Sequence, residues 1–281
     1  MLKIENLTFR YPGRNQATVS DMSLTVHAGG VYGLLGRNGV GKSTLLYLIA
    51  GLLTPDAGCV SFDGAITRRR DPLAMSSIFL VPEELTLPDL SLRDYVAINA
   101  PFYPRFSYDD LRRHLVTFEI DPELPYKLTS LSMGQRKKVF MSFALACNTP
   151  LVLMDEPTNG LDIPGKMAFR RFIASSIDDE RTIIISTHQV RDIDTLLDHV
   201  LIIDSDRVLL DASTSAIASR LAFVHTTDPD VASRALYASP AVGGISAVLP
   251  NDGTMETEIN LESLFELAVT HPDTLTSLFS K

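Results

Sequence analysis

The hydrophobic residues at the start of the chain alternate with polar ones. Leu2 and Ile4 show this pattern, and Met22, Leu24 and Val26 repeat it further along the chain. A period of two is typical of half-buried β-strands, because successive side chains of a strand point to opposite faces. We therefore expect the chain to begin with strands that place one face in a hydrophobic core.

Short apolar runs then alternate with longer segments of helical periodicity. The expected strands lie at 31–35, around 60–62, and at 78–81, 151–154, 182–186 and 200–203, and the expected helices lie at 41–50, 164–177 and 190–197. Strands that alternate with helices predict a parallel sheet covered by helices. The segment of about 88–147 is mainly helical, and we expect it to be an insert that divides this α/β part into two lobes.

The character of the sequence changes near residue 215. A short hairpin precedes the change, with strands at 200–204 and 207–210 and a turn at 205–206. After it come expected strands at 223–225 and 245–249 and expected helices near 231–237 and at 261–269. We therefore expect a large domain over 1–214 and a small α/β accessory domain over 215–281.

Composition limits the possible partners of the chain. Its 281 residues carry 34 acidic and 25 basic side chains, a formal net charge of -9, which disfavours broad binding to nucleic-acid phosphates. We therefore expect no nucleic-acid partner. No uncharged apolar stretch approaches the ~20 residues that a membrane-spanning helix needs. We expect a cytoplasmic protein that reaches the inner face of the membrane only through a partner.

A glycine-rich loop follows the expected strand at 31–35. The pattern G-x-x-x-x-G-K-[ST] is met in full by Gly36, Arg37, Asn38, Gly39, Val40, Gly41, Lys42, Ser43 and Thr44. Glycines let successive backbone N–H groups face one anion, and the following helix adds its N-terminal partial charge. Lys42 can bridge the terminal phosphates of a nucleoside triphosphate, and the Ser43 hydroxyl can bind Mg²⁺. This loop alone leaves kinases, GTPases and ATPases open.

Two carboxylates end the expected strand at 151–154. Asp155 fits a metal-holding role, directly or through water, and Glu156 is placed to act as the base for an attacking water. For this segment alone, two solvated acids at a strand end would be the default interpretation. The phosphate loop upstream in the same α/β domain favours the catalytic interpretation.

Several further motifs follow the order found in ABC ATPases. The segment Leu131-Ser132-Met133-Gly134-Gln135 resembles the signature of that family, whose usual form is LSGGQ. Asp162 ends a segment that looks like the D-loop, and His188 looks like the switch histidine. Tyr11 occupies the place of the aromatic residue that stacks on adenine. The order of these motifs over residues 2–212 is far more specific than any one of them.

This resemblance implies a P-loop NTPase fold of the ABC ATPase type. Such a fold has a mixed-sheet core, an antiparallel β subdomain and a helical subdomain. The resemblance also implies ATP and Mg²⁺ as cofactors, catalytic roles for Lys42, Glu156 and His188, and metal binding by Ser43, Asp155 and Glu83. The signature residues 132–135 would act on the ATP of a second ATPase subunit, identical or related. A separate integral membrane permease would be the other partner.

Two residues depart from the usual family pattern. Met133 replaces the first signature glycine, whereas the second is kept as Gly134. Glu83 stands where the family commonly has a glutamine, and a glutamate there resembles the ATPases of ABC-2-type exporters. The segments 99–106 and 259–265 also resemble small bacterial exporter ATPases of this subgroup.

Other interpretations stay open at this point. A soluble ABC ATPase that acts on ribosomes, DNA or iron–sulfur assembly is the main alternative to a transport ATPase. A P-loop kinase leaves the signature and switch motifs unexplained. Phe102, Tyr103 and Phe106 are equally compatible with a docking surface for a membrane partner and with core packing of the helical lobe.

Overall fold

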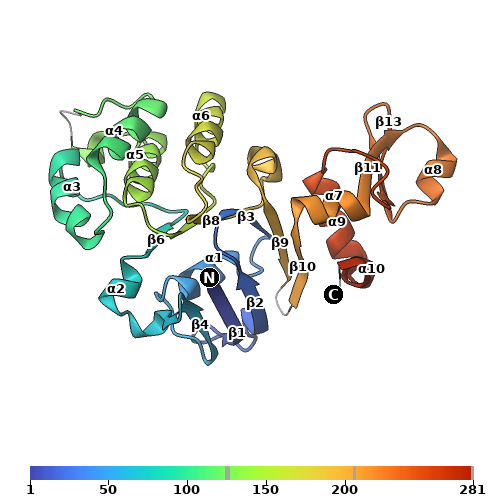
Figure 1. Cartoon of the computed structure of the whole chain (residues 1–281), viewed down its shortest axis with the longest axis horizontal. Coiled ribbons are helices and arrows are strands. Elements are labelled where there is room, and N and C mark those ends of the chain that lie inside the picture. Colours follow the sequence, from blue (N-terminus) through green and yellow to red (C-terminus); the bar gives the residue numbers. More distant parts are fainter. Residues whose placement is uncertain (124–126, 205–206, 280–281) are drawn as a thin grey trace.

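The computed structural model describes residues 1–123, 127–204 and 207–279, in which a six-stranded sheet forms the centre (Figure 1). Its order is β10-β9-β3-β8-β7-β6. The strands are β3 (Gly30–Leu35), β6 (Ile78–Val81), β7 (Leu151–Asp155), β8 (Thr182–Thr187), β9 (His199–Asp204) and β10 (Arg207–Ser213). Only β10 pairs antiparallel to its neighbour, whereas the other pairs are parallel. The predicted mixed sheet is confirmed.

The central strands lie between two hydrophobic cores. Val152 and Met154 of β7 enter the core shared with α5 (Met133–Ala146) and α6 (Ile163–Ala174). Leu151 and Leu153 point the other way, into the core shared with α1 (Lys42–Ile49). Burial on both faces explains why these strands read as continuous apolar runs.

An antiparallel sheet covers one side of this centre. Its order is β2-β1-β4-β5, with β1 (Leu2–Phe9), β2 (Val19–Val26), β4 (Ala57–Phe62) and β5 (Ala65–Ile66). Leu2 pairs with Val26 on one neighbour and with Phe62 on the other, and all three side chains are buried. The alternating pattern of the first residues therefore predicted the buried face correctly.

The helical insert lies between β6 and β7 and forms a lobe of its own (Figure 1). It contains α3 (Leu92–Asn99), η2 (Ala100–Phe102), α4 (Tyr108–Thr117), η3 (Leu128–Ser130) and α5. Two short elements, η1 (Thr67–Arg69) and α2 (Pro72–Met75), precede β6 and lie outside the insert. Tyr103 and Phe106 pack against Phe143 in the lobe, whereas Phe102 is 69% exposed. The three aromatic residues thus divide between core packing and an exposed surface.

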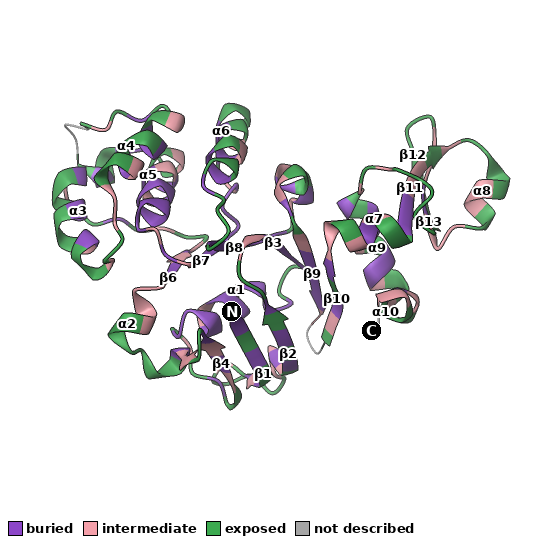
Figure 2. Ribbon diagram, in the orientation of Figure 1, coloured by how far each residue is buried: buried purple, intermediate pink, exposed green. Residues whose placement is uncertain are grey.

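The C-terminal part, which we expected to be an accessory domain, is built on a small antiparallel sheet of order β11-β13-β12. Its elements are α7 (Thr214–Arg220), β11 (Leu221–Thr226), α8 (Pro229–Ser233), β12 (Tyr237–Ala241), β13 (Gly244–Pro250), α9 (Leu261–Thr270) and α10 (Pro272–Phe279). Buried Leu264 and Leu275 belong to the same core as Leu210 of β10. Figure 2 shows buried residues along α9. The hydrophobic core therefore continues from the central sheet into the expected accessory domain.

Two expected helices are wrong. Residues 190–197 form two short 3-10 segments, η4 (Val190–Asp192) and η5 (Asp194–Leu196). Arg170 donates to the backbone carbonyls of Arg191 and Asp192, which a continuous helix would need for its own hydrogen bonds.

The expected helix near 231–237 is shorter in the structure, where α8 ends at Ser233. Tyr237 instead pairs with Val248 of β13, which makes it the first residue of β12. The expected turn at 205–206 lies outside the described residues. Within the described ranges, no helix is both long and apolar enough to cross a bilayer.

Candidate active site

The glycine-rich loop joins β3 to α1 at the carboxyl edge of the central sheet. Gly39 and Gly41 have φ of 78° and 108°, in the left-handed region that side chains disfavour. A Cβ on Gly41 would lie only 2.9 Å from the backbone oxygen of Thr18. Gly41 is therefore required both by its backbone conformation and by the close approach of the neighbouring chain.

Lys42 begins α1, and its side chain folds back onto the loop. Its Nζ donates to the carbonyl oxygens of Gly36, at 2.8 Å, and Arg37, at 3.3 Å. Burial lowers the pKa of Lys42, whereas the charges of Glu156 and Asp155 oppose that shift. The ammonium is thus held by neutral carbonyls beside two carboxylates, a setting in which an anionic phosphate oxygen is a favourable partner.

Glu156 follows β7, and residues at the end of β8 and directly after it form hydrogen bonds with its carboxylate. Oε2 accepts a hydrogen bond from Oγ1 of Thr187 at 2.9 Å, and Oε1 accepts one from the backbone N–H of His188 at 3.0 Å. Nδ1 of His188 lies 2.7 Å from Oε1. The φ of Glu156 is 44°, an unfavourable value for a residue with a side chain, and such backbone strain concentrates at functional sites.

Asp155 lies deeper than Glu156. It is 1% exposed, and its Oδ1 accepts a hydrogen bond from Oγ of Ser186. Asp155 does not line the pocket in front of the phosphate loop. The carboxylate therefore fits the water-mediated form of the expected metal role better than direct contact.

A pocket of about 430 Å³ brings most of the predicted site together. It is lined by Tyr11, Arg14, Thr18, Asn38, Gly39, Gly41, Lys42, Ser43, Thr44, Glu83, Glu156 and His188. The predicted residues that do not line it are Gly36, Arg37, Val40, Asp155, Ser132, Met133, Gly134, Gln135 and Asp162. The phosphate loop, Glu83, Glu156, His188 and the aromatic Tyr11 therefore share one cavity, as the motifs predict.

Arg14 is a lining residue that the motif search missed. The N–H of Arg14 donates to the carbonyl of Tyr11 at 3.1 Å, and Gly13 between them has φ of 79°. This turn places the Arg14 guanidinium 5.9 Å from the centre of the Tyr11 ring. Tyr11-Pro12-Gly13-Arg14 is a recognisable turn sequence, and this signal could have identified the pair.

A row of polar side chains leads away from Glu83. Nδ2 of Asn159 donates to Oε1 of Glu83 at 2.9 Å, and Nε2 of Gln189 donates to Oδ1 of Asn159 at 2.9 Å. Nζ of Lys166 then donates to Oε1 of Gln189 at 2.9 Å. Glu83 is thereby connected to the D-loop, to the segment after His188 and to α6.

Lys137 supports the backbone of this region, and no sequence motif predicted this role. It is 5% exposed, and its Nζ donates to the backbone carbonyls of Glu156, at 2.8 Å, and Asn159, at 3.0 Å. Burial lowers the pKa of Lys137, whereas the charge of Glu83 opposes that shift most. Lys137 therefore fixes the backbone of Glu156 and Asn159.

The signature residues lie at the start of α5, outside the pocket. Oγ of Ser132 accepts from the N–H of Gln135 at 3.3 Å, while the N–H of Ser132 donates to Oε1 of Gln135 at 3.0 Å. This capping box defines the helix start. A Cβ on Gly134 would lie 3.2 Å from the oxygen of Gly160, and Met133 is 72% exposed.

The D-loop ends at the start of α6. Asp162 caps this helix, because its Oδ1 accepts from the N–H of Gly165 at 3.0 Å. Nζ of Lys138 in α5 lies 4.0 Å from Oδ1 of Asp162, so the starts of α5 and α6 lie side by side, and neither lines the pocket.

The lining residues fit a nucleoside triphosphate with Mg²⁺. The loop supplies backbone donors and one ammonium for phosphate, and Tyr11 supplies an aromatic face for a base. The oxygens of Ser43 and Glu83, with Asp155 behind them, are the hard donors that Mg²⁺ prefers.

Comparison with known proteins agrees with this geometry. The profile of the ABC transporter family matches residues 19–159. The ABC transporter ATP-binding protein NatA of Bacillus subtilis is 31% identical over 221 residues, 74% of this chain and 88% of that protein. The thiamine import ATP-binding protein ThiQ of Jannaschia sp. is 34% identical over 218 residues, with 75% and 93% covered. The Nod factor export ATP-binding protein I of Burkholderia lata is 29% identical over 207 residues, with 72% and 68% covered.

A solved structure gives the same answer for the fold. It is described as the ATP binding subunit of an ABC transporter and aligns with a TM-score of 0.69 at 26% identity. The alignment covers 77% of this chain and 91% of that one. The chain therefore belongs to the family of ABC transporter ATP-binding proteins and is an ATPase of the ABC type.

Proposed function

We propose that this chain powers an exporter, as the ATP-hydrolysing subunit that works with a separate integral membrane permease. Two ATPase subunits, identical or related, would close around two ATP molecules. The observation that supports ATP hydrolysis is the position of Glu156. Its carboxylate lines the pocket with Lys42 and is fixed by Thr187 and His188.

Each site residue has a role that follows from its contacts. Backbone N–H groups of the loop and Nζ of Lys42 bind the β- and γ-phosphates. Ser43, Asp155 and Glu83 would hold Mg²⁺, which neutralises charge that develops on the phosphate oxygens. Glu156 orients the attacking water and accepts its proton. His188 keeps Glu156 in place through Nδ1 and leaves Nε2 available to a ligand in the pocket.

The helical lobe offers a surface for the permease. Ile98 and Phe102 are 55% and 69% exposed and lie at the end of α3 and in η2. Glu83 precedes this lobe in the chain and contacts Asn159 of the D-loop. A permease helix seated on the lobe would therefore act on the nucleotide site through Glu83. The chain would then lie at the cytoplasmic face of the membrane.

The direction of transport rests on Glu83. The relatives include proteins named for export and proteins named for import, so their names do not decide the direction. Glutamate at this position resembles the exporter subgroup, and we propose export on that basis. The alternative, a soluble ABC ATPase without a permease, lacks a specific supporting feature in this chain.

Purification from detergent-solubilised membranes tests the proposal. Tagged chain should co-purify with an integral membrane protein whose presence stimulates the ATPase. The double variant Ile98→Ser with Phe102→Ser should lose the co-purification and keep basal ATP hydrolysis. Recovery of ribosomes, DNA or assembly factors in place of a membrane protein would favour the soluble alternative. Cargo accumulation in inverted membrane vesicles then tests the direction, because an exporter fills them.

A further inference from the structure

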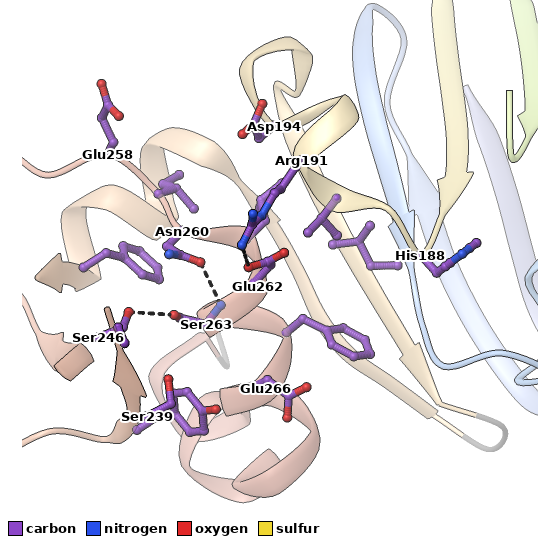
Figure 3. A pocket seen from close by; sticks show the side chains of 18 of the residues that line it. His188, Arg191, Asp194, Ser239, Ser246, Glu258, Asn260, Glu262, Ser263 and Glu266 are labelled. Carbon is purple, nitrogen blue, oxygen red and sulfur yellow. Dashed lines mark hydrogen bonds and ion pairs between the residues drawn. The ribbon is translucent and has the colours of Figure 1, made fainter. Parts of the chain in front are cut away.

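A wide cleft separates the accessory domain from the segment that follows His188 (Figure 3). We call it the accessory cleft; its volume is about 1440 Å³, larger than the roughly 300–1,000 Å³ of most small-molecule sites. Asn38 and His188 line both this cleft and the nucleotide pocket. The accessory cleft therefore opens directly beside the catalytic site and has the size to take a segment of protein.

The lining of the accessory cleft is aromatic and more acidic than basic, because its four acidic residues outnumber Arg37 and Arg191. Half-buried Phe223, Tyr237 and Phe265 supply apolar surface. Acidic side chains surround it: Asp194, Glu258, Glu262 and Glu266 (Figure 3). Oε2 of Glu262 pairs with Arg191 at 2.7 Å, whereas no cation in the described parts of the chain pairs with Glu258 or Glu266. Such a lining fits a partner with an apolar and basic surface.

Helix α6 carries a surface of that kind. Ile163, Met167 and Arg171 follow one another at four-residue spacing and so lie on one face, which we call the α6 stripe. Ile163 is 78% exposed and Met167 is 58% exposed. Arg171 is exposed and has no ion pair among the described residues. Ile163–Ala174 contains no acidic residue.

The α6 stripe and the accessory cleft lie on either side of the same short segment. α6 packs against η5, and Arg170 and Lys166 hold Asp192 from that side. α9 packs against η4 from the other side, and Arg191 contacts Glu262 there. Figure 1 shows α6 and α9 flanking this segment. A dimer whose two-fold axis runs beside 189–194 would bring each α6 stripe to the accessory cleft of the other copy.

From this arrangement we propose that, in the ATP-closed dimer, the accessory cleft receives the α6 stripe of a second copy of this chain. Ile163 and Met167 would cover the aromatic wall, and Arg171 would face the acidic side chains that include Glu266. The proposal rests on the proposed dimer and adds a role for the accessory domain. Because Asn38 and His188 line the cleft, its occupation would link closure of the accessory domain to the nucleotide site.

Photo-crosslinking tests the contact directly. Benzoylphenylalanine replaces Met167 in the full chain with Glu156→Gln, a change chosen to hold the ATP-bound state. With ATP and Mg²⁺, irradiation should give adducts between position 167 and residues 221–266 of the other copy. Mixing ¹⁵N-labelled and unlabelled chains identifies adducts between copies. Sedimentation of the same samples reports the dimer independently. A dimer with adducts elsewhere, or with none, would overturn the cleft contact while the proposed dimer stands.

A charge exchange tests the proposed ion pair between Arg171 of one copy and Glu266 of the other. Arg171→Glu and Glu266→Lys should each weaken the ATP-dependent dimer by roughly threefold to tenfold, and the double variant should regain most of the loss. Arg112→Glu on α4 and Glu256→Lys outside the cleft are matched controls, and both should dimerise as the parent does. Equal losses in the controls, or no regain in the double variant, would contradict the assigned pairing. Failure of every variant, the parent included, to dimerise with ATP would overturn the proposed dimer itself.

Discussion

Nδ1 of His188 lies 2.7 Å from Oε1 of Glu156, and the backbone N–H of His188 donates to the same oxygen. A carboxylate can only accept hydrogen bonds, so Nδ1 carries the proton in this contact. The histidine thus fixes the Glu156 carboxylate through backbone and side chain together. Of these two bonds, substitution of His188 removes only the one from the ring.

The first prediction concerns this ring. His188→Ala should lower the rate of ATP hydrolysis by roughly 10²-fold, because Glu156 loses its orienting partner. ATP binding should change little, since the phosphate loop is untouched. Turnover and the dissociation constant for ATP are measured on the same preparation. A hydrolysis rate within twofold of wild type would contradict the role given to His188.

Glu83 provides the second prediction. Glu83→Ala removes the expected Mg²⁺ ligand together with the acceptor for Asn159, so hydrolysis should need several-fold more Mg²⁺. Glu83→Gln keeps a side-chain oxygen and should be milder. Glu84→Ala, the adjacent exposed acid, is the control. Mg²⁺ titrations of the ATPase that superimpose for all variants would mean that Glu83 is only a solvated acid.

The third prediction concerns the base. The chain has no tryptophan, so Tyr11→Trp creates a single tryptophan, whose fluorescence nucleotide should quench if the base stacks there. Arg14→Ala in that background should weaken ATP and ADP equally, by roughly threefold to tenfold, because a guanidinium over the ring acts on the base. Arg69→Ala is the control. A loss confined to ATP would show that Arg14 contacts the γ-phosphate instead.

His114 gives a prediction for stability. It is 2% exposed in α4, its Nδ1 has no hydrogen-bond partner among the described residues, and burial lowers its pKa to about 4. The unfolded chain takes up this proton near pH 6.5, so the unfolded state binds more protons between pH 6.5 and 4. Stability should therefore fall as the pH falls through this window.

Chemical denaturation at pH 7.5 and pH 5 measures the effect. His114→Leu should remove roughly 1–2 kcal/mol of the loss in unfolding free energy, because leucine cannot take up the proton. His27→Gln, at an exposed site, should leave the pH dependence unchanged. An unaltered pH dependence in His114→Leu would assign the acid sensitivity to other groups.

Local motifs predicted much of the site, whereas contacts that depend on the tertiary fold were not predicted. Gly41 and Lys42 are contiguous, and their chemistry follows from their spacing. Glu156 and His188 meet because β7 and β8 are parallel neighbours, which the strand pattern made foreseeable. The contact of Lys137 with the backbone of Asn159 depends on how α5 packs, and no local pattern encodes that packing.

The segment after His188 was predicted wrongly for a related reason. Its apolar spacing is that of a helix, but Arg170 of α6 takes two of its carbonyls. That competition involves residues about twenty positions apart, so the periodicity of 190–197 could not reveal it. The extended β12 likewise depends on its pairing with β13.

The most direct test of the central claim is ATP turnover by Glu156→Gln, measured with its association state. Glutamine keeps the size of the side chain and its carbonyl oxygen but cannot accept the proton from water. The variant should bind ATP as wild type does, hydrolyse it at least roughly 10²-fold more slowly, and change from monomer to dimer when ATP is added. Wild-type turnover, or a chain that stays monomeric with ATP bound, would contradict the account.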